Sequence, residues 1–223
     1  MKSIMSLLAL FSLLSADNHG IMINGQVYGQ SLQGSGKVVS KNISLQPFEV
    51  IQIEGSLNLI IEKGDTYQAT VKTDDNLINN IEFIEQGSQL IIQSKESYST
   101  QKGIFIHLIT KSLRHLKMSG SINAKVKNLN EKQLYLETEG VSDLASESGS
   151  VDELTARLQG VYNVDLRHLD TQKAKVSMEG SGDLVVHVKD KLEADIQDNA
   201  SLTYIGNPQI TKKITDNGSI YQE

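Results

Sequence analysis

The sequence predicts an all-β protein, a right-handed parallel β-helix or a related β-solenoid with coils of about 18–20 residues. Its second half repeats one turn position at a nearly constant spacing, with apolar and polar residues in fixed columns around it. Such a repeat is typical of stacked β architecture, and parallel crossovers favour the right hand. The turn position is held by Gly120, Gly140, Gly160, Gly180, Asp198 and Asp216.

Three columns accompany this turn position. Apolar residues dominate two places before it and fill the fourth place after it, whereas the third place after it is always polar. The apolar columns are Met118, Thr138, Leu158, Met178, Ile196, Ile214 and Ala124, Leu144, Val164, Leu184, Leu202, Ile220. The polar column is Asn123, Asp143, Asn163, Asp183, Ser201 and Ser219. One coil cannot bury its own apolar face, so we expect neighbouring coils to stack.

The residue types at the turn position predict a tight bend in each coil. Glycine adopts a positive φ without steric penalty, and aspartate tolerates the left-handed region better than most residues do. We expect two or three strands of four to five residues in each coil, with coils about 4.8 Å apart.

Residues 1–16 read as a secretory signal peptide. A positive start at Met1-Lys2 precedes an apolar run from Ile4 to Leu14, and Ser15-Ala16 offers a small-residue cleavage site. The run is too short to span a bilayer. The chain contains no cysteine, which excludes disulfides, a thiolate nucleophile and the acylated cysteine of a lipoprotein. We therefore expect export to the periplasm, the cell envelope or the medium.

The remaining chain divides into three parts by pattern. Residues 17–33 form a polar leader or loop, residues 34–103 an irregular β subdomain, and residues 104–223 a regular β-solenoid subdomain. The expected strands of the first half are 48–53, 70–73, 81–84 and 90–92, with 94–103 as a loop or junction. Asn58 and Leu59 follow Gly55 at the spacing of the later columns, so the repeat extends into the first half.

The composition limits the classes of partner. The formal net charge is −6, which disfavours nucleic acid and anionic membrane surfaces. Beyond the leader, no apolar stretch is long enough for a transmembrane helix. The chain has no tryptophan, and its Tyr and Phe residues form no column, which lowers the expectation of an aromatic glycan platform.

Several short motifs resemble the autotransporter adhesin head GIN domain family of bacteria. They are Gly34-Ser35-Gly36, Phe48 with Ile51 and Ile53, Gly55, Gly64-Asp65, Ile109-Thr110 with Ser112-Leu113, 118–121, 179–184, 204–208 and 217–220. The resemblance covers residues 34–221 and departs at Lys111, Val141-Ser142 and Asp198-Asn199-Ala200. The resemblance implies a secreted β-helical protein, often with two stacked subdomains, and brings no catalytic residue with it.

A polysaccharide lyase or hydrolase is the enzymatic alternative. Asp143 and Asp183 share the polar column and would lie about 10 Å apart, near the upper limit for an inverting carboxylate pair. A base or charge clamp would have to come from Arg157, Asp165, Arg167, His168 or His187. The simpler interpretation is that the column's short polar side chains bond to the backbone at a turn or outward position.

Metal and cofactor signals are weak. Glu139 and Glu179 precede the turn glycines and would suit calcium only together with loop carbonyls. The histidines show no paired ligand spacing, and His107 alternates with apolar residues as a packed side chain does. No nucleotide-binding or serine-nucleophile motif is present. We expect no cofactor and no bound metal.

The sequence thus predicts a non-enzymatic, adhesin-like interaction module that presents a rigid β-solenoid face to a protein or glycan ligand. The candidate binding surface is the column Asn123, Asp143, Asn163 and Asp183. The terminal residues 220–223 leave the last coil without a cap, which predicts end-to-end association into a homo-oligomer.

Overall fold

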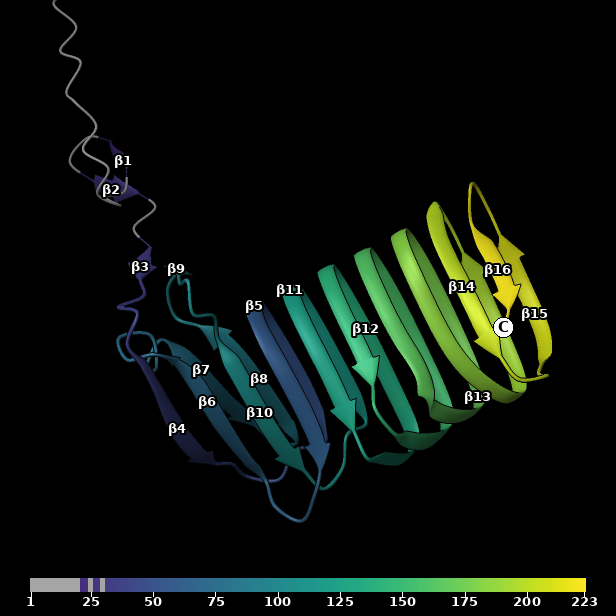
Figure 1. Ribbon diagram of the computed structural model, residues 1–223, viewed down its shortest axis with the longest axis horizontal. Coiled ribbons are helices and arrows are strands. Elements are labelled where there is room, and N and C mark those ends of the chain that lie inside the picture. The colour runs from purple at the N-terminus through teal and green to yellow at the C-terminus, as the bar shows by residue number, and fades with distance from the viewer. Residues whose placement is uncertain (1–20, 24–25, 29–30) are drawn as a thin grey trace, which may run out of the picture.

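The computed structural model describes residues 21–23, 26–28 and 31–223, and Figure 1 shows their arrangement. The predicted signal peptide and most of the predicted leader lie outside the described residues. The all-β prediction is confirmed, because the elements of the described residues are strands joined by turns and loops. These residues contain no helix long and apolar enough to cross a membrane.

The first half of the chain forms short strands around one long strand. The long strand is β5 (Val50–Lys63). The short strands are β1 (Ile21–Ile23), β2 (Gln26–Tyr28), β3 (Leu32–Gln33), β4 (Val38–Ser44), β6 (Gln68–Asp74), β7 (Ile81–Gln86), β8 (Gln89–Ser94), β9 (Tyr98–Ser99) and β10 (Phe105–Thr110). All four strands expected in this half are present.

The second half is built from much longer strands than the repeat predicts. They are β11 (His115–Lys127), β12 (Leu129–Ser146) and β13 (Gly149–Ile196), followed by the shorter β14 (Asn199–Ile205), β15 (Gln209–Ile214) and β16 (Ser219–Gln222). The expectation of four- to five-residue strands was wrong here. The ladder continues through each bend, since the coils on both sides bend at the same register position.

One 12-stranded mixed sheet joins both halves. Its order is β16-β14-β13-β12-β11-β5-β10-β6-β4, and β15, β7 and β8 pair beside this path. The antiparallel ladders of this sheet, β4 with β6, β6 with β10 and β7 with β8, lie in the part of the chain that lacks the repeat. A β-helix implies purely parallel pairing. Here such pairing holds only for β5 and for the strands from β11 to β16. The division into subdomains at residue 103 stays a prediction.

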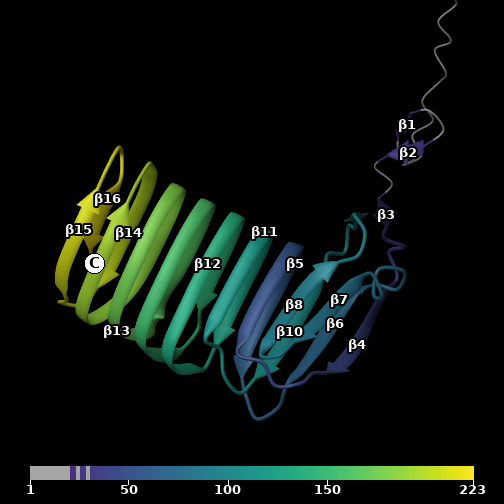
Figure 2. The same cartoon turned by 180° about the vertical axis from the view of Figure 1, so that it is seen from behind.

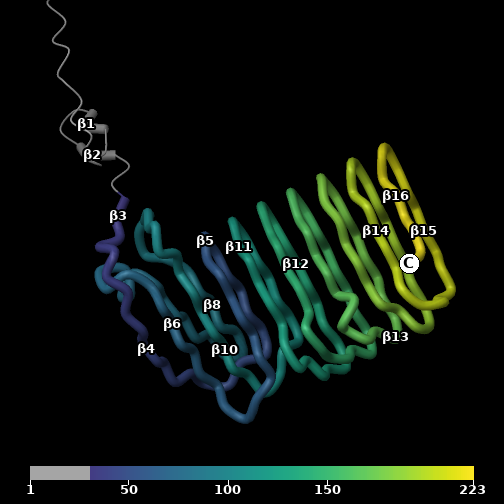
Figure 3. Tube along the Cα trace, in the orientation of Figure 1, coloured from purple at the N-terminus to yellow at the C-terminus, as the bar shows by residue number. Residues whose placement is uncertain are grey.

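The repeat appears in space as parallel pairing at a constant offset. Gly120 pairs with Gly140, and Gly140 with Gly160, so position i of one coil faces position i+20 of the next. The offset falls to i+18 where β13 pairs with β14 and β15. Figures 2 and 3 show the resulting loops of β11 to β16 stacked along one axis. The stack reaches back into the first half, as predicted, because Gly120 also pairs with Gly55 on β5.

The glycine column lines a shared bend with positive φ. Gly120, Gly140 and Gly160 have φ of 114°, 104° and 102°, and Asp198 and Asp216 both have 58°. The predicted left-handed bend is therefore confirmed for both residue types. A Cβ at Gly160 would lie 2.3 Å from the carbonyl oxygen of Gly140, closer than real contacts allow. Glycine at this position thus does two things: it adopts the positive φ, and it lets one coil approach the next closely.

The apolar columns form the core. Met118, Leu158 and Met178 are buried two places before the bend, and Leu144 and Val164 four places after it. A single cluster of buried apolar residues runs from Leu45 to Leu202 and so includes both halves of the chain.

Tyr162 is a large side chain of this core, and the residues beside it in the two neighbouring coils are small. Tyr162 is 3% exposed and pairs in register with Ser142. A Cβ at Gly182 would lie 2.6 Å from the Tyr162 ring, so glycine leaves room for that ring. Burial raises the pKa of Tyr162 to about 12, and the carboxylates of Asp198, Asp183 and Glu179 add to the effect. The Gly-Ser-Gly-Asp motif at 180–183 is thus explained by packing.

Ion pairs connect neighbouring coils on the outside. The carboxylate of Asp170 lies 2.8 Å from Lys189 Nζ and 3.0 Å from His187 Nδ1. The hydrogen bond from Lys189 is the main reason that the pKa of Asp170 is below its usual value. Glu147 makes a similar pair with Lys125 and Lys127, at 2.9 Å and 3.0 Å, and its pKa is also lowered.

We predict that Gly160→Ala destabilises the protein more than Gly87→Ala. Gly87 also has a positive φ, of 61°, but a Cβ there would meet no atom within 4 Å. The control should lose about 1–2 kcal/mol from the left-handed conformation alone. Gly160→Ala should lose about 1–3 kcal/mol more from overpacking against Gly140. Urea unfolding measures both, and equal losses would show that the close approach between coils is not limiting.

We predict that Asp170→Asn costs stability at neutral pH but not in acid. A carboxylate whose folded pKa lies below its unfolded pKa stabilises the fold above the unfolded value of about 4, and the stabilisation is lost as the pH falls through the folded pKa. The pair is solvent-exposed, so the cost should be at most about 1 kcal/mol. Urea unfolding at pH 7 and pH 2.5 measures it, with Asp152→Asn as the control. A cost that persists at pH 2.5 would contradict the ion-pair explanation.

Candidate functional site

The polar column predicted from the sequence forms a row of outward side chains, which we call the polar row. Its members are Asn58, Asn123, Asp143, Asn163 and Asp183. Asn123 pairs with Asn58 on one side and with Asp143 on the other, and Asp143 pairs with Asn163. Asn58 is half-buried, and the other four are exposed. Parallel strands place successive members about 4.8 Å apart.

Asp183 continues the row beyond Asn163, within the long strand β13. A Cβ at Gly182 would lie 2.0 Å from the carbonyl oxygen of Tyr162, so residues 182 and 162 lie side by side. Ser201 pairs with Asp183, and Ser219 with Ser201, which carries the row to β16. The structure therefore brings together all four residues of the candidate surface.

The exposed members of the polar row have unused hydrogen-bonding capacity. Among the described residues, the side chains of Asn123, Asp143, Asn163 and Asp183 have no hydrogen bond or ion pair with one another or with the rest of the protein. The simpler interpretation of the column required bonds from these side chains to the backbone, and the described residues do not make them. The amides and carboxylates of these four residues therefore face solvent.

A groove runs beside the first members of the polar row. It has a volume of about 790 Å³ and lies between the glycine bends of β5, β11 and β12 and the loop at residues 97–103. Asn58, Asn123 and Asp143 all line it. The Tyr98 hydroxyl donates a hydrogen bond of 2.5 Å to the carbonyl of Ser56, and burial raises the pKa of Tyr98. This bond fixes the loop against the bend of β5.

Asp74 holds the far side of the same loop. It is fully buried, and its carboxylate accepts hydrogen bonds from the backbone N–H of Gly36, at 2.8 Å, and from the Thr100 hydroxyl.

Two further hydrogen bonds hold the loop. The Gly34 N–H donates to the carbonyl of Ser99 at 2.8 Å, and the Thr73 hydroxyl donates to the carbonyl of Gly103 at 3.2 Å. The segment predicted as a loop or junction is therefore bonded on both sides, and it forms one wall of the groove.

A second hollow of about 390 Å³ adjoins the groove and shares Asn58 and Asn123 with it. Its centre is Phe105, which is 47% exposed on β10, with Ile60 of β5 beside it. We call this the Phe105 hollow. The sequence did not indicate it, because Phe105 lies outside the repeat and reaches the polar row only through the pairing of β10 with β5. Alternation of buried and exposed residues along 104–110 is the signal that marks Phe105 as outward.

The same alternation corrects the expectation for His107. Its side chain points outward rather than into the core, with 40% of it exposed. Its Nε2 atom lies 3.0 Å from Glu62 Oε2 on the neighbouring strand β5. His107 is thus a polar member of the outer face and lines the Phe105 hollow.

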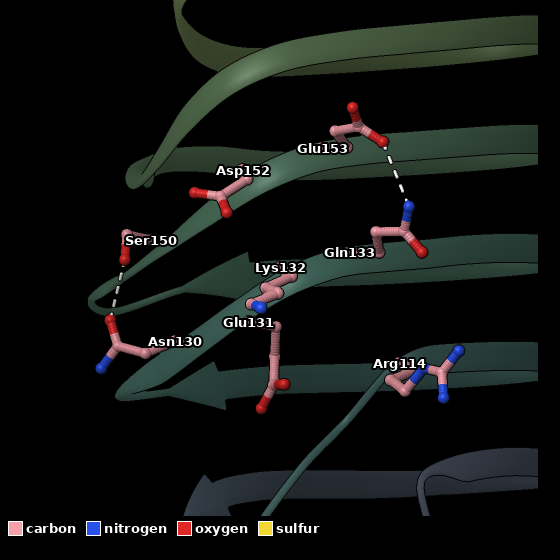
Figure 4. A pocket seen from close by; sticks show the side chains of 8 residues that line it. All are labelled: Arg114, Asn130, Glu131, Lys132, Gln133, Ser150, Asp152 and Glu153. Atoms are coloured by element: carbon pink, nitrogen blue, oxygen red, sulfur yellow. Dashed lines mark hydrogen bonds between the residues drawn. The ribbon is translucent and has the colours of Figure 1, made fainter.

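A third hollow, of about 840 Å³, lies on another part of the surface and is shown in Figure 4. Three of its charged residues already have ion-pair partners, and one of them is Glu153, which lies 3.8 Å from Lys173. Arg114 pairs with Glu49 at 3.0 Å, and Glu131 pairs with Lys63 at 3.0 Å and accepts a hydrogen bond from Ser112. Lys63 and Glu131 connect β5 to β12 where the two halves meet, so this pair serves the fold.

The residues considered for an enzyme do not converge on Asp143 or Asp183. Asp165 pairs with Arg167 at 2.9 Å, His187 with Asp170, and Arg157 lies 3.9 Å from Glu137. His168 is exposed and has no hydrogen bond to another described residue. No basic side chain of the described residues lies within hydrogen-bond distance of Asp143 or Asp183.

The two glutamates considered for calcium are also separated. Glu139 lies 3.7 Å from Lys117, and Glu179 accepts a hydrogen bond from Gln159. Across the described part of the chain, no group of three or more His, Cys, Asp or Glu residues could hold a metal ion.

Comparison with protein families identifies the relatives of this arrangement. The model of a family described as "Putative auto-transporter adhesin, head GIN domain" matches residues 47–208. The chain belongs to the head GIN domain family. The resemblance to this family is thereby confirmed over residues 47–208. The search of curated proteins found no match.

Solved structures share the fold at low sequence identity. A structure titled a putative adhesin from Bacteroides fragilis matches with a TM-score of 0.68 and 16% identity, over 86% of this chain and 100% of that one. One titled a putative adhesin from Parabacteroides merdae has a TM-score of 0.58 and 18% identity, over 86% and 99%. One titled a putative lipid binding protein from Parabacteroides distasonis has a TM-score of 0.54 and 20% identity, over the same shares. At these identities the likeness concerns the fold alone.

Proposed function

We propose that this head GIN domain protein is a secreted or envelope-bound interaction module of adhesin type, without enzymatic activity. The polar row carries this proposal. Its exposed amides and carboxylates have no hydrogen bonds to the described residues, and they are held in register by backbone pairing. A rigid array of exposed polar groups loses little entropy on binding, which suits it for recognition.

The scaffold that holds the row is, in our proposal, a right-handed parallel β-helix from β5 and β11 onward. Parallel pairing of position i with i+20, and later with i+18, supports it, as does the shared bend at the glycine column. The right hand follows from the general preference of parallel crossovers. The antiparallel strands β4, β6 and β7 adjoin this stack at its N-terminal end, as Figure 1 shows.

The proposed location is the periplasm, the cell envelope or the medium. The signal-peptide pattern at residues 1–16 and the absence of cysteine support export without lipid attachment. The adhesin name of the family agrees with an envelope or extracellular site. Self-association through the terminal coil stays a prediction.

The lack of enzymatic activity is supported by where the charges lie. Asp143 and Asp183 are separated by two strand spacings, about 10 Å, which is near the upper limit for an inverting pair, and no basic side chain of the described residues bonds to either. Asn163 lies between them in the row. The family and the related structures carry adhesin names, which agrees with binding.

We predict that the purified protein retains a ligand from an array of glycans and host or bacterial surface proteins, and that the polar row contributes to the affinity. The double variant Asn123→Ala/Asp143→Ala should bind about tenfold more weakly, because two polar contacts of about 0.5–1.5 kcal/mol each are lost. Lys175→Ala is the control and should bind as the wild type does. Lys175 is exposed and lies before the bend of its coil, whereas the polar row lies after it.

Mass spectrometry of the same wells tests for products. Binding without cleavage supports the module. Cleavage of a polysaccharide that depends on Asp143 or Asp183 would overturn it in favour of a lyase or hydrolase. Unchanged affinity of the double variant would remove the polar row from the binding surface.

A further inference from the structure

The Phe105 ring is the exposed aromatic group that the sheet places beside the polar row. Phe105 pairs with Asn58 on β5, which pairs with Asn123 on β11, so the ring lies in line with the amides of the row. On its other side Phe105 pairs with Lys72 on β6. Directly opposed side chains of neighbouring strands have Cβ atoms about 4.5–5.5 Å apart. An aromatic ring is therefore flanked by an ammonium group and an amide.

The local backbone leaves the Phe105 ring accessible, whereas the half-buried Asn58 amide donates a hydrogen bond of 3.4 Å to the Ile104 carbonyl and keeps its Oδ1 atom for a ligand. Gly103 has a φ of 76°, and a Cβ there would lie 3.3 Å from the Phe105 ring and 3.8 Å from the Asn58 amide nitrogen. A larger residue at 103 would thus crowd the Phe105 ring. The Thr73 hydroxyl donates to the Gly103 carbonyl at 3.2 Å, which fixes this backbone segment.

The cation beside the ring is available. Lys72 is exposed and has no hydrogen bond or ion pair with another described residue. Lys125, which also lines the Phe105 hollow, is already paired with Glu147 at 2.9 Å. Lys72 therefore offers a positive charge to a ligand in a protein whose net charge is −6.

We infer that the Phe105 hollow binds an acidic glycan, with a sugar ring stacked on Phe105 and its carboxylate at Lys72. The hydroxyl groups of this and the next sugar bond to Asn58 and Asn123, which line both the hollow and the adjoining groove. The inference rests on the proposed interaction function and names its ligand class and site.

The chemistry of the site favours a saccharide over an acyl chain. A sugar ring has a C–H face that packs on an aromatic ring and hydroxyls that both donate to and accept from amide groups. The surface of the hollow is mostly apolar, from Phe105 and Ile60, which suits the C–H face of a sugar ring, and the polar groups of Lys72 and Asn123 at its border would gain no partner from an acyl chain. Its volume of about 390 Å³ lies within the usual range for small-ligand sites.

The test measures binding of acidic oligosaccharides by titration calorimetry. The probes are oligogalacturonate and sialyllactose, each compared with its methyl ester. Phe105→Ala should weaken binding at least tenfold, whereas Phe105→Trp should retain it, because the ring face is kept. Lys72→Gln should remove the preference for acid over ester. Tyr221→Ala removes an aromatic side chain that is 61% exposed elsewhere, and it should change nothing.

Circular dichroism and urea unfolding verify that each variant is folded, and Phe105 is exposed enough for its loss to be tolerated. The inference is overturned if neither acidic probe binds, if Phe105→Ala binds like the wild type, or if acid and ester bind equally. It is also overturned if phosphatidylcholine vesicles bind in a Phe105-dependent manner and the saccharides do not. If the array yields only a protein ligand whose binding does not depend on Phe105, this site is overturned but the proposed function stands. If no array member binds, the proposed function itself is overturned.

Discussion

The rest of the structure depends on one constraint, the close approach of neighbouring coils at the shared bend. At Gly120, Gly140, Gly160 and Gly180 there is no room for a Cβ, because the carbonyl oxygen of the preceding coil occupies that space. When each coil bends at the same register position, the ladder continues through the bend. The side chains before and after it then stay aligned from coil to coil, so that the core columns and the polar row both follow from this one contact.

The same alignment explains how a structural repeat becomes a surface. Inward columns bury apolar residues such as Leu144 and Val164, whereas the intervening outward column leaves Asn123, Asp143 and Asn163 in solvent. The mixed strands of the first half extend this outer face beyond the repeat. Through β10 and β6 they place Phe105 and Lys72 beside the amides, and through the loop at 97–103 they add one wall of the groove.

The sequence could predict what repeats and the positions of the alternating strands of the first half, but not how those strands pair. The glycine column, the core columns and the polar row are visible from spacing, because each coil encounters the same neighbours as the last. Phe105 and the Asp74 hydrogen bonds depend on antiparallel and long-range pairings that occur once, so no periodicity marks them. The strands of the second half are longer than predicted for a related reason. A glycine bend interrupts a strand in most sheets, but here the neighbouring coils bend at the same position and the pairing continues.

Hydrogen exchange of the backbone amides, with and without the ligand that the array retains, tests the central claim most directly. Amides at the bends around Gly140 and Gly160 should exchange only through global unfolding, as expected for the most stable part of a fold. Added ligand should slow exchange at residues 56–59, 103–107 and 121–125. Rapid exchange at the bends, or ligand protection confined to other strands, would contradict an aligned stack that carries the binding face.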